Sequence, residues 1–379
     1  MKNYKIALFH PWIKSRGGAE RVVLELLKNF KNIDVYTWVY DEKKTFKEFK
    51  KYKINVIAPK FFKRISRTFL LRSLFLPISF FSKIPLEKYG LFLISTSGLA
   101  ELIVFRNYKK EKTGVYCHTI LRAACKENIK WNSKRYKNPF SKLIYLLAAR
   151  IYKFLEKRAW KKINWAVFNS EISLKRAEEH SLLKDKKIKI IYPPIDLKKF
   201  SKLKIKDKKF LLCVSRFNPD KRQDKVILAW KEFVKEHPKY KLFLVGNIEN
   251  KKFFEKIKKM ARGEKSIKIK TNLNEGKLLE LYETCSGGIF SGYREDFGIV
   301  PFEFLAAGKP LAIVEGGGYE GLIKNLPQVV FFKENNNEKE FVEDMKRAME
   351  RIIKKKSKKI KIKEVSKKNF IKKINALIR

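Results

Sequence analysis

The sequence predicts an α/β protein of two doubly wound domains, each a parallel β-sheet covered by helices, facing a central cleft. Short apolar runs alternate with segments of helical periodicity along the whole chain, as in parallel sheets with crossover helices. A chain of 379 residues is longer than one ordinary domain. The alternation pauses at Tyr192–Asp196, where a double proline precedes a lysine-rich connector. We therefore expect a domain boundary there.

The first domain is predicted over residues 1–195. Its strands are short and mostly apolar, and they are expected at Ile6–Phe9, Asp34–Trp38, Asn55–Ala58, Leu91–Ser95, Gly114–Cys117, Trp165–Phe168 and Ile188–Ile191. Helical spacing of apolar residues predicts helices over Glu20–Phe30, Ser141–Lys162 and Glu171–His180.

The second domain is predicted over residues 196–355 and repeats the pattern. Its strands are expected at Phe210–Val214, Lys241–Val245, Ile267–Lys270, Gly288–Phe290, Pro310–Val314 and Val329–Phe332. Its helices are expected at Arg222–Glu236, Lys251–Ala261, Glu275–Thr284 and Ile299–Ala307. In residues 356–379, apolar positions such as Phe370 and Ile374 recur at helical spacing among the lysines. A basic final helix that packs back toward the first domain follows from this pattern.

Composition limits the class of protein. Hydrophobic residues make up 45% of the chain, which argues against disorder. The four cysteines have neither disulfide nor zinc spacing and fit a reducing compartment. The first apolar run is too short for a signal peptide, and no run of about 18 apolar residues predicts a membrane span. We expect a cytoplasmic protein that can also lie on the inner face of the cell membrane.

The formal net charge of +49 predicts an anionic partner. One interpretation is an ordinary solvated surface in a lysine-rich protein, and the other is an anionic membrane surface. A nucleic-acid partner is not expected, because no nucleic-acid motif accompanies the charge. The segment Lys60–Pro77, continuing to Pro85, mixes bulky apolar and basic residues without an acid. It is either an amphipathic membrane-surface segment or a half-buried helix lining the cleft.

A glycine pair, Gly17 and Gly18, lies between the first predicted strand and the first helix. Glycine there lets backbone N–H groups approach phosphate oxygens closely, although an ordinary turn has the same sequence. Neither a GxGxxG pattern nor a Walker lysine is present, which argues against standard dinucleotide and ATP-hydrolysing sites.

Two basic residues, Arg216 and Lys221, follow the first strand of the second domain. On a loop after a parallel strand they can straddle a diphosphate, the arginine by paired hydrogen bonds and the lysine as a point charge. A chance pairing is the alternative in so basic a chain.

Two carboxylates, Glu295 and Glu303, stand eight residues apart around a predicted helix start. Gly298 can adopt backbone angles closed to other residues, and Pro301 suits a first helical turn. Free N–H groups at that end would attract an anion, and Glu303 one turn further on could accept hydrogen bonds from a vicinal diol. This combination predicts a site for an activated sugar nucleotide.

The four histidines divide into two groups. His118 ends a predicted strand and is either a hydrogen-bonding core residue or an active-site group, and His10 is similar. His180 and His237 fall at helix ends and are interpreted as structural. Neither zinc spacing nor a Ser/His/Asp order is present, so no metal site is predicted.

Taken in order along the chain, these motifs resemble those of retaining glycosyltransferases of family 4, which have the GT-B architecture of two Rossmann-like domains. The matching segments are Gly17–Arg21, Ser95–Gly98, Asn169–Ser170, Tyr192–Asp196, Arg216 with Lys221, and Glu295 with Glu303. The resemblance covers nearly the whole chain and implies an acceptor-binding first domain and a nucleotide-sugar-binding second domain.

The resemblance also implies roles for particular residues. Glu303 would hold the nucleotide ribose, and Glu295 would lie near the hydroxyls of the donor sugar. Backbone amides of Phe297–Ile299 would contact the sugar and the diphosphate. His118 would lie near the primary hydroxyl of the donor sugar, and the Gly17 loop would also contact the donor.

The expected reaction is transfer of a hexose, with retained configuration, from a nucleoside-diphosphate sugar to a glycan or lipid-linked acceptor. Tyr116–Thr119 and Glu295–Pro301 look most like GDP-mannose-dependent enzymes, whereas Ile120 departs from that pattern. Front-face attack is favoured, with Arg216 and Lys221 stabilising the departing diphosphate, so no cofactor and no metal is required. The alternatives are a UDP-sugar donor, or a polyanion-binding protein on the same scaffold.

Overall fold

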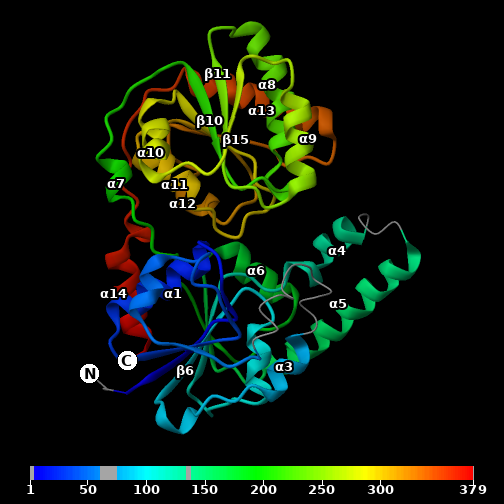
Figure 1. Ribbon diagram of the computed structural model, residues 1–379, viewed down its shortest axis with the longest axis vertical. Coiled ribbons are helices and arrows are strands. Elements are labelled where there is room, and N and C mark those ends of the chain that lie inside the picture. The colour runs from blue at the N-terminus through cyan, green and yellow to red at the C-terminus, as the bar shows by residue number, and fades with distance from the viewer. Residues whose placement is uncertain (1–3, 60–74, 134–137, 379) are drawn as a thin grey trace. The chain divides into compact units, whose positions relative to one another are not determined.

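The computed structural model describes residues 4–59, 75–133 and 138–378, and the chain forms two compact units (Figure 1). Unit 1 comprises Met1–Pro194 together with Lys367–Arg379, and unit 2 comprises Ile195–Ser366. The first boundary lies directly after the double proline, where fixed backbone angles and a missing N–H group end regular structure. The segment Lys60–Pro77, for which a membrane-surface role was predicted, lies mostly outside the described residues.

Unit 1 contains a seven-stranded parallel sheet in the order β5-β3-β1-β6-β7-β8-β9. Its strands are β1 Ile6–Phe9, β3 Ile33–Thr37, β5 Ile54–Val56, β6 Leu91–Thr96, β7 Thr113–Cys117, β8 Trp165–Phe168 and β9 Lys187–Ile190. The chain runs outward from β1 through β3 to β5 and then returns to place β6 beside β1. The sheet is therefore doubly wound, with its switch point between β1 and β6. A short pair, β2 Trp12–Ile13 and β4 Val39–Tyr40, lies outside this sheet.

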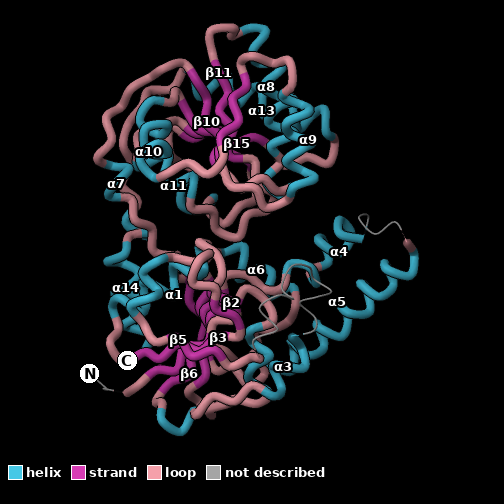
Figure 2. Tube along the Cα trace, viewed as in Figure 1, coloured by secondary structure: helices cyan, strands magenta, loops and turns pink. Residues whose placement is uncertain are grey.

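Alternate residues of these strands enter two separate cores, one on each face of the sheet. Phe9 and Ile94 pack in one core, while Leu8 and Leu93 pack in the other. Both faces are therefore apolar, as expected for a parallel sheet that helices cover. Figure 2 shows the strands of unit 1 with helices around them. The helices of unit 1 are α1 Gly18–Asn29, α3 Phe75–Phe81, α4 Lys126–Ser133, α5 Pro139–Trp160, α6 Glu171–Glu179 and α14 Lys367–Ile378.

Unit 2 contains a six-stranded parallel sheet in the order β12-β11-β10-β13-β14-β15. Its strands are β10 Phe210–Val214, β11 Lys241–Val245, β12 Ile267–Lys270, β13 Gly287–Phe290, β14 Leu311–Val314 and β15 Val329–Phe332. The switch point lies between β10 and β13, and it is there that ligands of such sheets bind, beyond the carboxyl ends of the strands. The predicted α/β class with two doubly wound sheets is confirmed.

The helices of unit 2 are α7 Lys198–Ser201, α8 Gln223–Glu236, α9 Lys251–Ala261, α10 Glu275–Thr284, α11 Val300–Ala306, α12 Glu320–Ile323 and α13 Glu338–Ile353. Helix α13 was not predicted, because its charged residues outnumber the apolar ones. It nevertheless has a buried stripe that includes Phe341, Met345 and Met349. This stripe packs into the core of unit 2 together with Leu211 and Ala312.

The final helix differs in length from the prediction. It covers Lys367–Ile378 only, and its Phe370 and Ile374 are buried in the core of unit 1. The residues before it belong to unit 2, where Ser366 forms a β-bridge with Ile195. Among the residues that the structure describes, none of the helices is long and apolar enough to span a membrane.

Candidate active site

Two loops meet at the switch point of unit 2, one after β10 and one after β13. The Ser291 hydroxyl donates to the carbonyl oxygen of Lys221 at 2.8 Å, and the Tyr293 amide donates to the carbonyl oxygen of Asp220 at 2.8 Å. These bonds connect the segment that carries the predicted basic pair with the segment that carries the two predicted glutamates.

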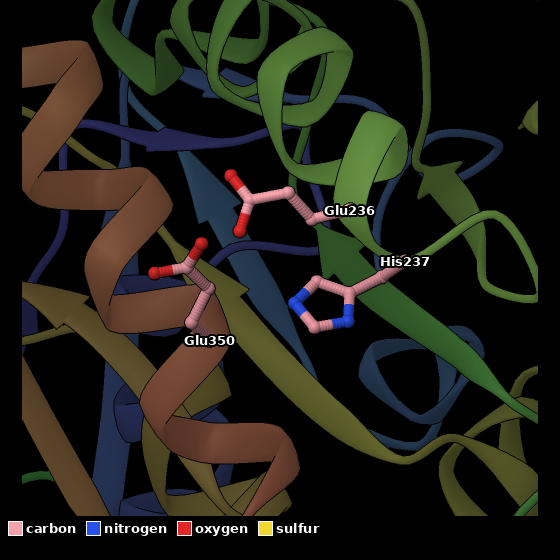
Figure 3. Close-up of side chains that lie close together, drawn as sticks. All are labelled: Glu236, His237 and Glu350. Atoms are coloured by element: carbon pink, nitrogen blue, oxygen red, sulfur yellow. The ribbon is translucent and has the colours of Figure 1, made fainter.

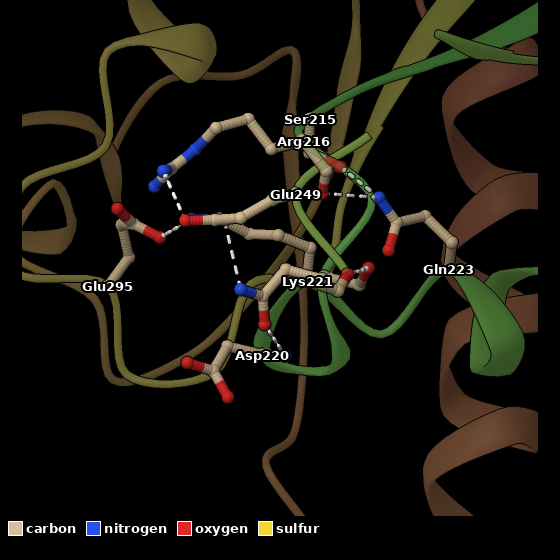
Figure 4. A network of polar contacts seen from close by, with 9 residues as sticks. Ser215, Arg216, Asp220, Lys221, Gln223, Glu249 and Glu295 are labelled. Atoms are coloured by element: carbon tan, nitrogen blue, oxygen red, sulfur yellow. Dashed lines mark hydrogen bonds and ion pairs between the residues drawn. The ribbon is translucent and has the colours of Figure 1, made fainter. Parts of the chain in front are cut away.

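Lys221 and Glu295 form an ion pair across these loops (Figure 4). The two side chains are 15% and 23% exposed, so water screens the pair only in part. Lys221 is the last residue of a short 3₁₀ turn, whose start is capped by the Asn218 side chain accepting from the Asp220 amide at 3.1 Å. The structure therefore holds a cation and a carboxylate together where the sheet topology predicts a ligand.

Arg216 lies in the same loop and pairs with Glu249, with Nη1 2.8 Å from Oε1. The Arg216 side chain is 61% exposed, and the other oxygen of Glu249 accepts from Asn218 Nδ2 at 2.9 Å. In the same region, Gln223 Nε2 donates to Ser215 Oγ at 2.7 Å and to the Arg216 carbonyl oxygen at 2.9 Å. Gln223 thus holds the loop backbone, while the guanidinium faces solvent.

Gly246 and Glu249, which were not predicted, lie in the neighbouring loop after β11 and contact the loop that carries Arg216. A Cβ added to Gly246 would lie 1.8 Å from the carbonyl oxygen of Ser215, so a side chain there would displace the loop after β10. The available signal was the position of Gly246 directly after a strand, which often marks a close backbone approach. Nothing in the sequence pattern pairs Glu249 with Arg216, because 33 residues separate them.

Glu303 lies on α11, which has Pro301 in its first turn, as predicted. Its Oε2 accepts a hydrogen bond at 2.7 Å from the hydroxyl of Tyr282 on α10. Tyr282 is buried, and burial together with the Glu303 charge raises the pKa of its phenol well above the ordinary value. The phenol therefore stays protonated, and its bond fixes one oxygen of the Glu303 carboxylate.

The residues before α11 have the predicted backbone geometry. Gly298 has φ +77°, a conformation that favours glycine, and a Cβ there would meet the Tyr319 ring at 3.0 Å. No side chain caps the start of α11, which follows Ile299. Phe297 is buried and stacks on Phe302 with ring centroids 5.1 Å apart. The Phe297 side chain is thus a core contact, so only its backbone can contact a ligand.

A second cluster lies at the switch point of unit 1. The Ser95 hydroxyl is 3.0 Å from His10 Nδ1 and 2.9 Å from His118 Nε2. Both histidines are buried, and burial lowers their pKa values, that of His118 well below 6.5 with a further contribution from His10. Two neutral imidazoles therefore share one hydroxyl. The sequence indicated His118, His10 and the Ser95–Gly98 segment separately but did not connect Ser95 to the two histidines.

A pocket of about 180 Å³ adjoins this cluster and is lined by His10, Trp12, Ser15, Ala19, Glu20, Ser97, Gly98, Leu99 and Leu121. Gly17 caps the start of α1, and Gly18 is its first residue. A Cβ added to Gly17 would lie 2.6 Å from Oε2 of Glu20, whose other oxygen accepts from the Ser15 hydroxyl. The glycine pair therefore lies beside a buried carboxylate, which opposes the approach of a phosphate to these amides.

Buried polar side chains stabilise the turn at Leu99, which lines the pocket, through a series of hydrogen bonds. Leu99 has φ 76°, an unfavourable angle for leucine, and its amide donates to Glu101 Oε1 at 3.1 Å. The other oxygen of Glu101 accepts from Thr96 Oγ1 at 2.6 Å. Burial, with the nearby charge of Glu156, raises the pKa of Glu101. His180 lies at the other end of this series, where its Nδ1 is 2.8 Å from Oε2 of Glu156.

One group of possible metal ligands lies elsewhere in the described part of the chain, formed by Glu236, His237 and Glu350 (Figure 3). Lys346 Nζ is 2.6 Å from Glu236 and 2.8 Å from Glu350, so both carboxylates already share a lysine as their cation. The C-terminus of α8 and the helix α13 contribute these residues. Since α8 follows a strand of a doubly wound sheet, its last residues lie away from the carboxyl ends of the strands.

Two family models match the chain. Residues 194–369 match "Glycosyl transferases group 1", and residues 16–199 match "Glycosyltransferase Family 4". These matches cover nearly the whole chain and meet at the boundary of the two units. The chain belongs to the family 4 glycosyltransferases and is an enzyme of the glycosyltransferase class.

Two curated relatives resemble the chain over most of its length. A human protein named GDP-Man:Man(3)GlcNAc(2)-PP-Dol alpha-1,2-mannosyltransferase is 24% identical over 83% of this chain and 73% of its own. An alpha-1,3/1,6-mannosyltransferase of Dictyostelium discoideum is 24% identical over 84% of this chain and 83% of its own.

Solved structures agree on the fold. Anabaena HepE in complex with UDP and glucose superposes with a TM-score of 0.65 over 99% of both chains at 14% identity. A glycosyltransferase from Rickettsia africae gives a TM-score of 0.66 over 100% of this chain and 98% of its own, at 16% identity. The GT-B architecture expected from the resemblance is confirmed.

Proposed function

We propose that the protein transfers mannose from GDP-mannose, with retained configuration, to a glycan or lipid-linked acceptor. The observation that carries the proposal is the Lys221–Glu295 pair with Arg216 nearby, at the switch point of a doubly wound sheet. The names of both curated relatives describe mannosyltransferases, and one names a PP-Dol acceptor. In this proposal unit 2 binds the nucleotide sugar and unit 1 binds the acceptor.

The proposed donor contacts follow from charge and hydrogen-bonding capacity. Arg216 is exposed enough to exchange Glu249 for diphosphate oxygens, which its planar guanidinium can grip bidentately. Lys221 adds a second positive charge, and its departure toward the diphosphate frees Glu295 to accept hydrogen bonds from sugar hydroxyls. Glu303, with one oxygen fixed by Tyr282, keeps acceptor capacity for the two ribose hydroxyls.

The proposed chemistry is front-face substitution. The bond between the anomeric carbon and the diphosphate oxygen breaks, and the acceptor oxygen bonds to the same face of that carbon. The acceptor proton passes to the departing diphosphate, whose growing charge Arg216 and Lys221 stabilise. His118, kept neutral by burial, can hydrogen-bond a sugar hydroxyl but does not supply a fixed cation. Since two basic side chains supply the positive charge, we propose that no metal is required.

A thermal-shift panel of GDP, UDP, ADP and their sugars tests the donor. Selective stabilisation by GDP and GDP-mannose is expected, because a ligand that binds only the folded state stabilises it by an amount that grows with the logarithm of the ligand concentration relative to Kd. A response to UDP-sugars alone would mean that the donor is a UDP-sugar and would leave the proposed enzyme class unchanged. Silence across the panel, with steeply salt-dependent binding to DNA or RNA, would favour the polyanion-binding alternative.

A further inference from the structure

The helix α5, Pro139–Trp160, carries an unusual share of the apolar surface. Fourteen large hydrophobic side chains are exposed among the residues that the structure describes, and seven of them lie on this one helix. They are Phe140, Leu143, Ile144, Leu146, Leu147, Ile151 and Phe154. Single exposed hydrophobic residues are ordinary, whereas a contiguous group indicates a binding surface.

These side chains form one continuous stripe, because their spacings of three and four residues place them on one side of a helix. Phe140, Leu147 and Ile151 are between 51% and 68% exposed. The opposite side of α5 includes Tyr145 and Tyr152, which are buried in unit 1. The stripe is therefore not the core-facing side of the helix, and Figure 1 shows α5 along the periphery of unit 1.

The charges on α5 are almost all positive. Lys142, Arg150, Lys157 and Arg158 are exposed beside and among these side chains, and the Arg158 guanidinium carbon lies 4.3 Å from the centroid of the Phe154 ring. The single acidic residue of the helix, Glu156, is buried and bonded to Tyr152 and His180. The outer surface of α5 thus combines apolar and basic groups without an exposed carboxylate.

We propose that this stripe lies on an anionic lipid bilayer, with α5 parallel to the membrane surface. An apolar face bordered by lysine and arginine is the pattern of helices that insert into the headgroup region to a depth of about 5–10 Å. Anionic lipid supplies the countercharge that α5 lacks. A second copy of the chain is disfavoured as the occupant, because pairing two such helices would bring their basic side chains together with no exposed acid between them.

The stripe consists of other residues than Lys60–Pro77, the segment with this role in the sequence prediction, and the proposal does not rest on the proposed reaction. Binding can be measured on the full-length protein without donor or acceptor, so failure of the glycosyl-transfer proposal would leave it standing. The converse also holds, because a nucleotide sugar can bind an enzyme that has lost its lipid contact.

The test is flotation of the full-length protein with vesicles of phosphatidylcholine containing about a third phosphatidylglycerol, compared with pure phosphatidylcholine. The stripe variant is Leu143→Ser with Ile151→Ser, at side chains 53% and 55% exposed. The matched control is Val56→Ser with Ile188→Ser, at edge-strand side chains 48% and 37% exposed. All four side chains are exposed, so both variants should keep the circular dichroism spectrum and melting temperature of the parent.

The parent protein should float with anionic vesicles, and the stripe variant should bind them at least tenfold more weakly at about 0.15 M salt. The control should stay within twofold of the parent, which separates the stripe from the adsorption expected of any chain with a net charge of +49. Equal binding by the parent and the stripe variant would overturn the proposal. A parent that is dimeric by light scattering and becomes monomeric in the stripe variant, without vesicle binding, would also overturn it and assign the stripe to a second copy.

Discussion

The switch points of the two sheets have the same strand order, but one carries charged side chains and the other carries neutral ones. In unit 2 the loops place partly exposed ions at the strand ends, with Lys221 paired to Glu295. In unit 1 the corresponding place is occupied by two buried, neutral histidines that share the Ser95 hydroxyl. Similar backbones thus offer a charged site suited to a diphosphate and a neutral site suited to hydroxyl groups.

Removing a charge should therefore have its largest effect in unit 2. We predict that Lys221→Ala lowers the rate of GDP release from GDP-mannose by about 100- to 1,000-fold, the usual result of removing one contact to a developing oxyanion. The variant also removes the positive charge that lies beside Glu295, which leaves more negative charge near the diphosphate and adds to the loss. Lys235→Ala, which removes an exposed lysine paired only with Glu232, is the control and should turn over normally. A rate within a few-fold of the parent would remove Lys221 from the site.

The second prediction concerns Glu303, whose carboxylate accepts the hydrogen bond from the Tyr282 hydroxyl. Glu303→Ala should weaken GDP binding by about ten- to a hundredfold, because hydrogen bonds to a charged group contribute about 1.5–3 kcal/mol. Isothermal titration with GDP measures the change. Tyr282→Phe keeps the carboxylate but removes the bond that orients it, so its effect should be smaller. If GDP bound the alanine variant and the parent equally, Glu303 would not contact the nucleotide.

The third prediction tests the neutral site through pH. Because the pKa of folded His118 lies well below 6.5, the unfolded chain takes up a proton near pH 6.5 while the folded chain does not. The unfolded state then binds more protons, so stability falls as the pH drops below about 6.5, by about 1.4 kcal/mol per pH unit for each such histidine.

Urea denaturation between pH 7.5 and 5.0 checks this dependence. His118→Gln removes one titrating group, so the stability of this variant should decline less steeply than that of the parent over the same range. His237→Gln is the comparison, at a histidine stacked on Phe233. Parallel pH profiles for the parent and His118→Gln would mean that His118 titrates normally in the folded protein.

The two switch points also differ in how far the sequence predicts them. Strands such as Leu91–Thr96 are buried on both faces and begin with a short apolar run, so the sheets and their class could be predicted. The basic pair and both glutamates follow strands, and strand ends of one sheet meet at one edge. The contacts of Glu249 and Ser95 could not be predicted in this way, because these residues acquire their roles only through tertiary contacts. At the Gly17 loop the sequence pattern alone is ambiguous. The pattern fits a phosphate-binding loop, but the folded chain places the Glu20 carboxylate beside it.

The smallest predicted effect comes from Ser95, the residue that the sequence analysis did not connect to the histidines. Ser95→Ala removes the hydroxyl that contacts both imidazoles, but His10 Nδ1 also lies 3.2 Å from the Ser95 backbone carbonyl oxygen and keeps that partner. His118 Nε2 then loses this partner, while His10 Nδ1 keeps one of its two contacts to Ser95, so the free energy of unfolding should fall by about 1 kcal/mol. Ser141→Ala, at a half-buried serine near the start of α5, is the control and should be close to neutral. A loss well above about 3 kcal/mol would indicate that a histidine is charged in the folded state and depends on the hydroxyl, which would end the contrast between a charged and a neutral switch point.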